Sequence, residues 1–379
     1  MHPNTDDAQA KPADPQDITR RGFLQGSAAA AGGAMLSGLF TQGAHADDDE
    51  HDHGPKRATC VAVAASEQGD FVAAFTSDDN GQLIKYVIEN DKLLPTTPFR
   101  RKHKGKAAYV AVAGNRVLTA GYDGDVIVHD AASDDEKRPT FTLHRKDAPR
   151  QVWVAILSND GKKALSATND GQIMLWDPTL EVPDNGKVDV FVDKKDFRAA
   201  PVGGLAFLSG EKNGPPTHFL STYSHGDIKL WKIGKTDGPV DTVSHNNSFH
   251  VNGLVAANDP AAGTNGRQFV SGGFDGTVRV WGIPDITAIN KLPKQEKHKI
   301  KAHKNWVWRV ALAPDGKLAA SASEDGKIGV WNTFSGKQHC PGIEVGKGGS
   351  MGVAFGPDGF LYYTLDGSNP AMLLDRKKV

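Results

Sequence analysis

Residues 302–332 read AHKNWVWRVALAPDGKLAASASEDGKIGVWN, and this stretch decides the fold. It contains three apolar runs, at 307–312, 318–321 and 328–331, separated by Pro-Asp-Gly and Glu-Asp-Gly. Short β-rich runs joined by Asp-Gly turns are typical of antiparallel hairpins. The stretch therefore predicts one small antiparallel sheet whose strands follow one another along the chain.

The same pattern returns along most of the chain. Ser or Thr, four variable residues, Gly, four variable residues and an aromatic residue recur about every 47 residues. Six copies fit this phrase, and a seventh is degraded. The glycines of the seven copies are Gly81, Gly124, Gly171, Gly226, Gly276, Gly326 and Gly367. A period of about 20 to 50 residues is typical of propellers and other repeat architectures.

The repeat resembles the WD40 family. Trp176-Asp177 is the dipeptide that gives the family its name, and Ala302-His303 stands where the family usually has Gly-His. The resemblance covers about 320 of the 379 residues. It implies an all-β, seven-bladed β-propeller over residues 58–379. The same fold hosts many unrelated activities, so the resemblance says little about function.

The resemblance also implies some internal detail. The family builds a hydrogen-bonded stack of His, hydroxyl, Asp and Trp inside a blade, and the sixth repeat has the full set, His303, Ser321, Asp325 and Trp331. The other repeats lack an aligned His, so we expect partial stacks there. The family usually closes the ring with an N-terminal strand. We therefore expect the stretch just before Cys60 to join the last blade, whose third strand is expected at 372–374.

The first 46 residues resemble a twin-arginine export signal. TRRGFL at 19–24 is followed by an Ala/Gly-rich apolar run at 27–40 and by Ala-His-Ala at 44–46. That run is too short and too Gly-rich for a membrane anchor, and no other segment approaches ~18 apolar residues. We expect a cleaved signal peptide at 1–46, a periplasmic protein without a stable membrane anchor, and an acidic, His-containing mature N-terminus at 47–57.

Amino-acid composition excludes few functional classes. The chain has 44 basic and 45 acidic residues, and removing the signal leaves it neutral, so net charge predicts no partner. The two cysteines, Cys60 and Cys340, fall on blades that are not adjacent, which argues against a disulfide. The sequence contains no phosphate-binding loop, Gly-x-Ser-x-Gly elbow or His-Glu-x-x-His motif. No cofactor is evident from motifs, and the identity of any cofactor stays open.

The basic residues are concentrated in the links between blades. In a propeller these links emerge on one face, where a ring of Lys and Arg would attract an anionic partner. The alternative is that many of the lysines only protect exposed sheet edges. The predicted partner-binding residues are Arg101, Lys102, Lys104, Arg145, Arg150, Arg198, Lys301, Lys304 and Trp306. Trp153 and Trp308 are expected to pack in the core.

Several histidines suggest a different kind of site. Imidazole and carboxylate groups bind Zn or Cu, so a metal site is conceivable in the acidic tail and around the fourth repeat. The candidate ligands are His51, His53, His225, His245 and His250. The competing interpretations are a solvated tail, or a tail that folds back onto the basic face.

Two functional hypotheses follow. The first is a non-catalytic periplasmic interaction scaffold whose basic and aromatic face docks an acidic protein or another polyanion. The export signal argues against nucleic acid as that polyanion. The alternative is a metal- or cofactor-dependent propeller, a hydrolase or redox accessory protein, that uses histidines near the central channel.

Overall fold

The computed structural model describes fifteen ranges of the chain, all from residue 58 onward. The expected signal peptide at 1–46 and the segment 47–57, with His51 and His53, lie outside the described residues. Every described residue belongs to one compact unit, Gly54–Val379. The described ranges are 58–65, 72–89, 92–96, 98–100, 102–131, 140–142, 150–179, 188–196, 200–209, 215–245, 250–257, 267–283, 291–347, 349–365 and 374–379.

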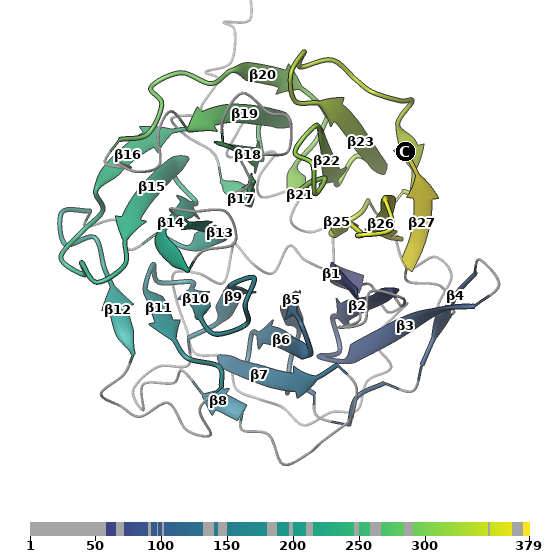
Figure 1. Ribbon diagram of the computed structural model, residues 1–379, viewed down its shortest axis with the longest axis horizontal. Coiled ribbons are helices and arrows are strands. Elements are labelled where there is room, and N and C mark those ends of the chain that lie inside the picture. The colour runs from purple at the N-terminus through teal and green to yellow at the C-terminus, as the bar shows by residue number, and fades with distance from the viewer. Residues whose placement is uncertain are drawn as a thin grey trace, which may run out of the picture. The chain divides into compact units, whose positions relative to one another are not determined.

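Seven antiparallel sheets surround a central axis as blades, six with four strands and one with three (Figure 1). Each sheet uses strands that are consecutive in the chain, so the all-β, seven-bladed propeller predicted from the repeat is confirmed. Blades 1 to 3 are formed by β1 (Ala58–Ala65), β2 (Val72–Asp78), β3 (Leu83–Glu89) and β4 (Lys92–Pro95); β5 (Ala107–Ala113), β6 (Arg116–Gly121), β7 (Asp125–Asp130) and β8 (Thr140–Thr142); and β9 (Val152–Leu157), β10 (Ala164–Thr168), β11 (Ile173–Trp176) and β12 (Asp189–Phe191).

The remaining four blades continue in the same order. The first strand of every blade lies at the axis and the last lies at the rim (Figure 1). Blades 4 to 7 are formed by β13 (Val202–Ser209), β14 (Pro216–Tyr223), β15 (Asp227–Lys232) and β16 (Asp241–Ser244); β17 (Val251–Ala257), β18 (Arg267–Gly273), β19 (Thr277–Ile283) and β20 (His298–Lys301); β21 (Val307–Leu312), β22 (Leu318–Ser323), β23 (Lys327–Asn332) and β24 (Ile343–Glu344); and β25 (Val353–Phe355), β26 (Phe360–Thr364) and β27 (Leu374–Lys378).

The glycine of the repeat lies in the turn between the second and third strands. Gly326 has a φ of 85°, and a Cβ there would lie 2.6 Å from the carbonyl oxygen of Gly346 in the following link. That link approaches closely because the Val345 amide donates to the Gly326 carbonyl at 2.9 Å. A side chain would both strain the turn and push the link away, which explains why glycine recurs at this position.

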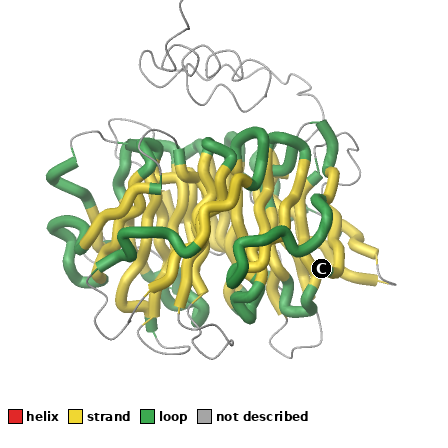
Figure 2. The backbone as a smooth tube through the Cα atoms, turned by 90° about the horizontal axis from the view of Figure 1, so that it is seen from above, coloured by secondary structure: helices red, strands yellow, loops and turns green. Residues whose placement is uncertain are grey.

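These bonds place the turns and the links between blades on one face of the ring, which we call the link face. The amides of His103, His245 and His303 donate to the carbonyls of Gly81, Gly226 and Gly276 at 3.0, 2.8 and 3.0 Å. Loops cover both ends of the strands (Figure 2), and the hairpin turns between first and second strands lie on the opposite face.

The hydrophobic core is distributed among the joints between neighbouring blades. Between blades 3 and 4, Phe191 packs edge-on against Phe219 with ring centroids 4.9 Å apart, and Trp231 stacks on Phe219. All three side chains are fully buried. Because each joint has its own cluster, the position of each link-face side chain depends mainly on the two blades beside it.

Among the described residues, blades 7 and 1 pack side by side where the ring closes. The residues before Ala58 lie outside the described ranges, so a closing strand from that stretch stays a prediction. Val61 of β1 shares a buried cluster with Tyr86 and with Tyr362 of β26. The described residues just before Cys60, Ala58 and Thr59, belong to β1, where Ala58 pairs with Asp78 of β2. Their backbone groups are therefore used inside blade 1. The last strand is β27, later in the chain than expected.

Two further expectations concern cysteines and membrane segments. Cys60 is buried in β1, Cys340 lies in the loop after β23, and both are free thiols. Within the residues described, no helix has the length and apolar character needed to cross a membrane.

Candidate functional site

The predicted stack in blade 6 is present. One ring nitrogen of His303, Nε2, lies 2.7 Å from Ser321 Oγ, and Nδ1 lies 3.1 Å from Asp325. Trp331 Nε1 donates to the same Ser321 Oγ at 2.9 Å. Burial lowers the pKa of His303, so the ring is neutral at pH 7. We assign its single proton to Nδ1, which donates to Asp325, while Nε2 accepts the Ser321 hydroxyl.

The expectation that only blade 6 contains this histidine is wrong. In blade 2, His103 contacts Asp123 at 2.9 Å and Thr119 Oγ1 at 2.9 Å. His129 replaces the tryptophan there, 3.2 Å from the same Thr119 hydroxyl. Burial would raise the pKa of Asp123, but the His103 bond and two backbone amides hold it below its ordinary value.

Blade 5 contains a third such histidine. His245 Nδ1 lies 2.7 Å from Ser271 Oγ, and Nε2 lies 3.0 Å from Thr277 Oγ1. Burial lowers the pKa of His245. Both ring nitrogens are therefore occupied by hydroxyl groups inside the blade, and the structure does not bring His245 to the other proposed metal ligands.

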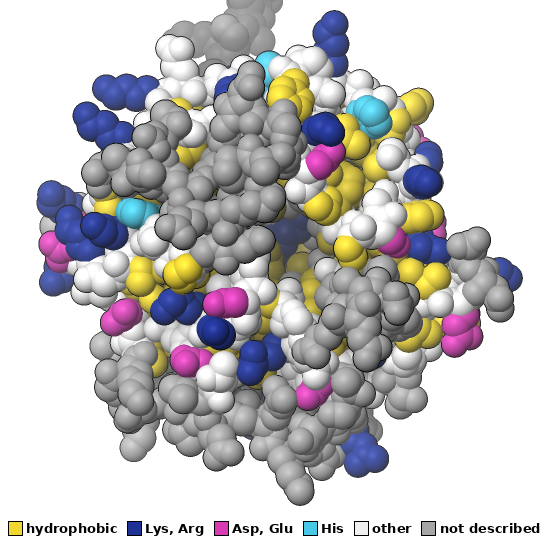
Figure 3. Space-filling model, viewed as in Figure 1, with side chains coloured by type: hydrophobic (Ala, Val, Ile, Leu, Met, Phe, Trp, Pro, Cys, Tyr) yellow, Lys and Arg dark blue, Asp and Glu magenta, His cyan; other side chains and the backbone are white. Residues whose placement is uncertain are grey.

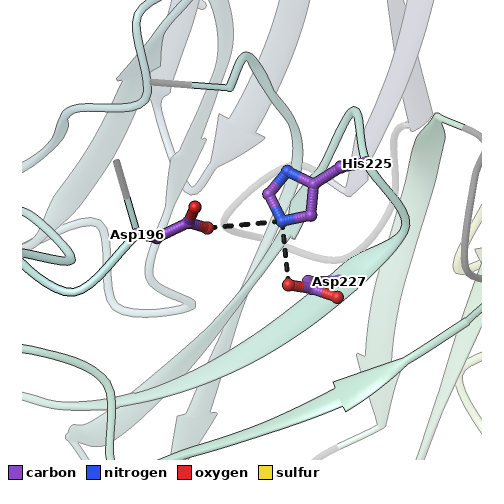
Figure 4. Close-up of side chains that lie close together, drawn as sticks. All are labelled: Asp196, His225 and Asp227. Carbon is purple, nitrogen blue, oxygen red and sulfur yellow. Dashed lines mark hydrogen bonds and ion pairs between the residues drawn. The ribbon is translucent and has the colours of Figure 1, made fainter. Parts of the chain in front are cut away.

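Blade 4 exchanges the two partners of the stack. Asp196 lies six residues before β13, as His245 lies six residues before β17, and His225 occupies the turn position that is Asp275 in blade 5. His225 Nε2 lies 2.8 Å from Asp227 Oδ2 and 3.4 Å from Asp196 Oδ2 (Figure 4). The link thus supplies the carboxylate and the turn supplies the imidazole, which moves the histidine from the blade interior toward the link face.

A buried lysine joins this cluster. Lys229, whose side chain is 2% exposed, places Nζ 2.7 Å from Asp193 and 2.7 Å from Asp196, and 4.4 Å from the centre of the Tyr223 ring. Burial would raise the pKa of Asp193, but the Lys229 bond holds it below its ordinary value. One atom each from Asp196, His225 and Asp227 lies within 4.8 Å of the others, a donor set that divalent transition metals accept.

Two other candidate ligands, His245 and His250, are not part of this cluster. His250 lies just before β17 and stacks on Phe274, with centroids 5.1 Å apart. Burial lowers the pKa of His250 to about 4, so its ring is neutral at pH 7. His51 and His53 lie outside the described residues. The metal interpretation therefore depends on His225 with two carboxylates that sequence reasoning did not select.

Four of the predicted basic residues are exposed on the link face. Lys102 and Lys104 lie in the link before β5, Lys301 ends β20, and Lys304 lies in the link before β21. The side chains of these four lysines form no ion pair with any described carboxylate. Arg150 differs, because its guanidinium pairs with Asp170 at 2.9 Å. Arg101, Arg145 and Arg198 lie outside the described residues.

Trp306 belongs to a stack of aromatic rings on the same face. Its ring lies parallel to Phe274, with centroids 4.6 Å apart, and His250 covers the other side of Phe274. Trp306 is partly exposed, whereas Trp308 and Trp153 are buried, as expected for core residues. Trp306, Phe274 and His250 thus form an aromatic shelf between blades 5 and 6, beside Lys304.

One functional candidate was missed by the sequence reasoning. Arg309 of β21 reaches blade 2, where Nη2 donates to the Ala108 carbonyl at 3.3 Å and the guanidinium lies 4.8 Å from the centre of the Tyr109 ring. Blades 6 and 2 are not neighbours in the ring (Figure 1), so the bond between Arg309 and Ala108 joins two blades across the centre of the ring. The alternating pattern of 307–310 gives no signal for such a long-range contact.

Comparison with known proteins supports the repeat assignment. Residues 137–177, 238–282 and 294–332 match the family model "WD domain, G-beta repeat". These segments end in the third strands of blades 5 and 6 and one residue after the third strand of blade 3. The chain therefore carries WD40 repeats within a seven-bladed β-propeller.

Individual proteins resemble the chain at low identity. It is 22% identical over 174 residues to "Target of rapamycin complex subunit wat1" of Schizosaccharomyces pombe, a match covering 46% of this chain and 48% of the relative. It is 23% identical over 284 residues to "Serine-threonine kinase receptor-associated protein" of Gallus gallus, covering 75% and 66%. The chain thus spans less than two thirds of either relative.

A solved structure shares the fold. The β-propeller domain of Cps50 (Swd1) from Myceliophteria thermophila superimposes with a TM-score of 0.65 at 18% identity, covering 85% of this chain and 97% of that domain. Likeness at this identity concerns the fold alone.

Proposed function

We propose that this chain is a non-catalytic interaction scaffold that acts in the periplasm and docks an acidic protein on its link face. The observation that carries the proposal is the pairing of exposed, unneutralised lysines with a partly exposed aromatic shelf on that face. Lys301, at the end of β20, and Lys304 precede Trp306 in the chain, and Lys102 and Lys104 add charge from another link. Aromatic anchors surrounded by cationic side chains are typical of binding hot spots.

Two properties of relatives are consistent with a scaffold role. One relative is named as a subunit of a complex and another as receptor-associated. The periplasmic location rests on the export-type sequence at 19–46. It is tested by fractionation and by the mass of the mature protein, which we expect to begin at residue 47.

The docking face is tested by charge reversal. K102E/K304E should strongly weaken capture of an acidic partner from periplasmic extract at about 50 mM salt, and raising salt to about 500 mM should do the same to the wild type. The matched control is K162E/K317E, which reverses two exposed lysines on the opposite face. Capture that is insensitive both to salt and to K102E/K304E would reject this face as the docking surface.

A cation-dependent role is the second candidate, and the observation that favours it is the cluster of Asp196, His225 and Asp227. These side chains offer one imidazole nitrogen and two carboxylate oxygens, but Lys229 competes for Asp196. Metal analysis of protein purified from the periplasm decides the matter. Less than about a tenth of an equivalent of bound metal would remove this candidate.

A further inference from the structure

The hydrogen bonds of Arg309 run to neutral acceptors of two separate blades. Its Nη1 donates to the carbonyl of Trp308 at 3.0 Å, and its Nη2 donates to the carbonyl of Ala108. Its Nε is buried and has no hydrogen-bond partner among the described residues. Every acceptor that the described residues place around this guanidinium is therefore neutral, and three of its five N–H groups bond to none of these residues.

Three other buried cations of the ring, unlike Arg116, face carboxylates. Lys229 contacts Asp193 and Asp196, Arg279 contacts Asp275 at 3.6 Å and Glu296 at 3.5 Å, and Arg376 contacts Asp358 at 3.4 Å. No carboxylate of the described residues lies within 4 Å of the Arg309 guanidinium. A partly buried charge without a counter-charge is costly, so its position on the channel axis calls for a functional explanation.

Topology places the guanidinium at the link-face end of the channel. β21 begins directly after the link at 302–306, and Arg309 is its third residue. Ala108 is the second residue of β5, which likewise begins at a link. Seen down the axis, the ring is hollow at its centre, and Lys or Arg atoms are visible inside the hollow (Figure 3). The contact between Arg309 and Ala108 therefore joins the link-face ends of β21 and β5.

Two phenols near this charge remain hydrogen-bond donors. Burial raises the pKa of Tyr109 to about 12, and burial also raises the pKa of Tyr122, while the charge of Arg309 opposes both shifts. Both hydroxyl groups thus stay protonated at pH 7. A guanidinium with an unused N–H beside protonated phenols is a donor set suited to an anion.

We propose that Arg309 anchors a carboxylate-binding site at the mouth of the central channel, which receives an aspartate or glutamate side chain of the docked partner. The inference rests on the proposed function, because the partner is the acidic protein of the link face. The exposed lysines would attract the partner, and Arg309 would bind one of its carboxylates in a less hydrated setting. Trp306 lies three residues before Arg309 in the chain, in the link that leads into β21.

The test uses a defined probe, an N-acetylated, C-terminally amidated hexaglutamate peptide that carries fluorescein. Binding is measured by fluorescence anisotropy at about 20 mM salt, where exposed charges are weakly screened. We expect R309M to weaken binding about tenfold or more, and R309K to fall between R309M and the wild type because it keeps the charge without the planar fork.

The matched control is R116M. Arg116 is also a partly buried guanidinium with an unpartnered Nε, but it starts β6 at the opposite face and donates to Gly161 of the neighbouring blade at 3.3 Å. R116M should bind the probe within about twofold of the wild type. Phenylglyoxal modification of Arg309 in the wild type, located by mass spectrometry, should slow when the probe is bound, a readout that needs no variant to fold.

The outcomes separate this inference from the proposed function. If the wild type does not bind the probe, the acidic-partner proposal itself fails. If the wild type binds but R309M binds equally well and phenylglyoxal protection is absent, only the Arg309 site is overturned. Glutarate should displace the probe at lower concentration than inorganic phosphate does. The reverse order would overturn the assignment to a carboxylate.

Discussion

Ser321→Ala tests the hydrogen-bonded stack, and the structure sets the size of the effect. Ser321 Oγ is fully buried, accepts the Trp331 indole N–H and donates to His303. A buried hydrogen bond contributes about 1 kcal/mol net, and leaving its partner unsatisfied adds to the loss. Two such bonds disappear, so we expect the free energy of unfolding to fall by roughly 2–3 kcal/mol.

The same substitution in other blades provides internal controls. Ser271 also contacts both a His and a Trp, so S271A should match S321A. Ser166 bonds only to Trp176, at 3.1 Å, among the described residues, so S166A should cost about 1 kcal/mol.

The assay is equilibrium urea unfolding followed by tryptophan fluorescence, with the dependence on urea required to stay constant so that midpoints can be compared. An equal loss in S321A and S166A would show that the His contact adds nothing. A loss below about 0.5 kcal/mol in S321A would refute the reasoning altogether.

Two further predictions concern stability. The pKa values of His245, His250 and His303 lie below the ordinary value near 6.5, that of His250 at about 4, so the unfolded chain binds more protons than the folded chain below pH 6.5. The free energy of unfolding should therefore fall as the pH is lowered from 7 to 4, and a flat profile by urea titration would contradict neutral buried imidazoles. Lys229→Met should destabilise the fold by about 3 kcal/mol or more because Asp193 and Asp196 lose a buried partner. Lys232→Met, at an exposed position of the same strand, should change little, and equal effects would contradict the ion-pair account.

The blade pattern was predictable because its signals are local. The Asp-Gly turns need a glycine, as the φ of Gly326 illustrates, and the aromatic five residues later packs in the same sheet. The sequence did not predict which blades contain the stacked histidine. His303 lies 23 residues before its turn glycine, but His103 lies 21 and His245 lies 31 residues before theirs. Because the links differ in length, the stacked histidine lies at a different distance from the turn glycine in each blade. Alignment on the glycines therefore does not identify it.

The candidate site was predictable only in part, for the same reason. The exposure of Lys104 and Lys304 follows from their place in links, which topology brings to one face. Two contacts depend on side-chain geometry between separate segments. They are the ion pair of Arg150 with Asp170 and the hydrogen bond from Arg309 to the Ala108 carbonyl. Ala108 and Arg309 are 201 residues apart, and no periodicity encodes such a contact.

The joint between blades 7 and 1 has a kinetic consequence. Every other joint connects blades that follow one another in the chain, whereas Val61 meets Tyr362 only after some 300 residues have folded between them. The entropy of closing so long a loop must be overcome before that contact contributes anything. We therefore expect this seam to form last during folding and to exchange its amide hydrogens first in the native protein.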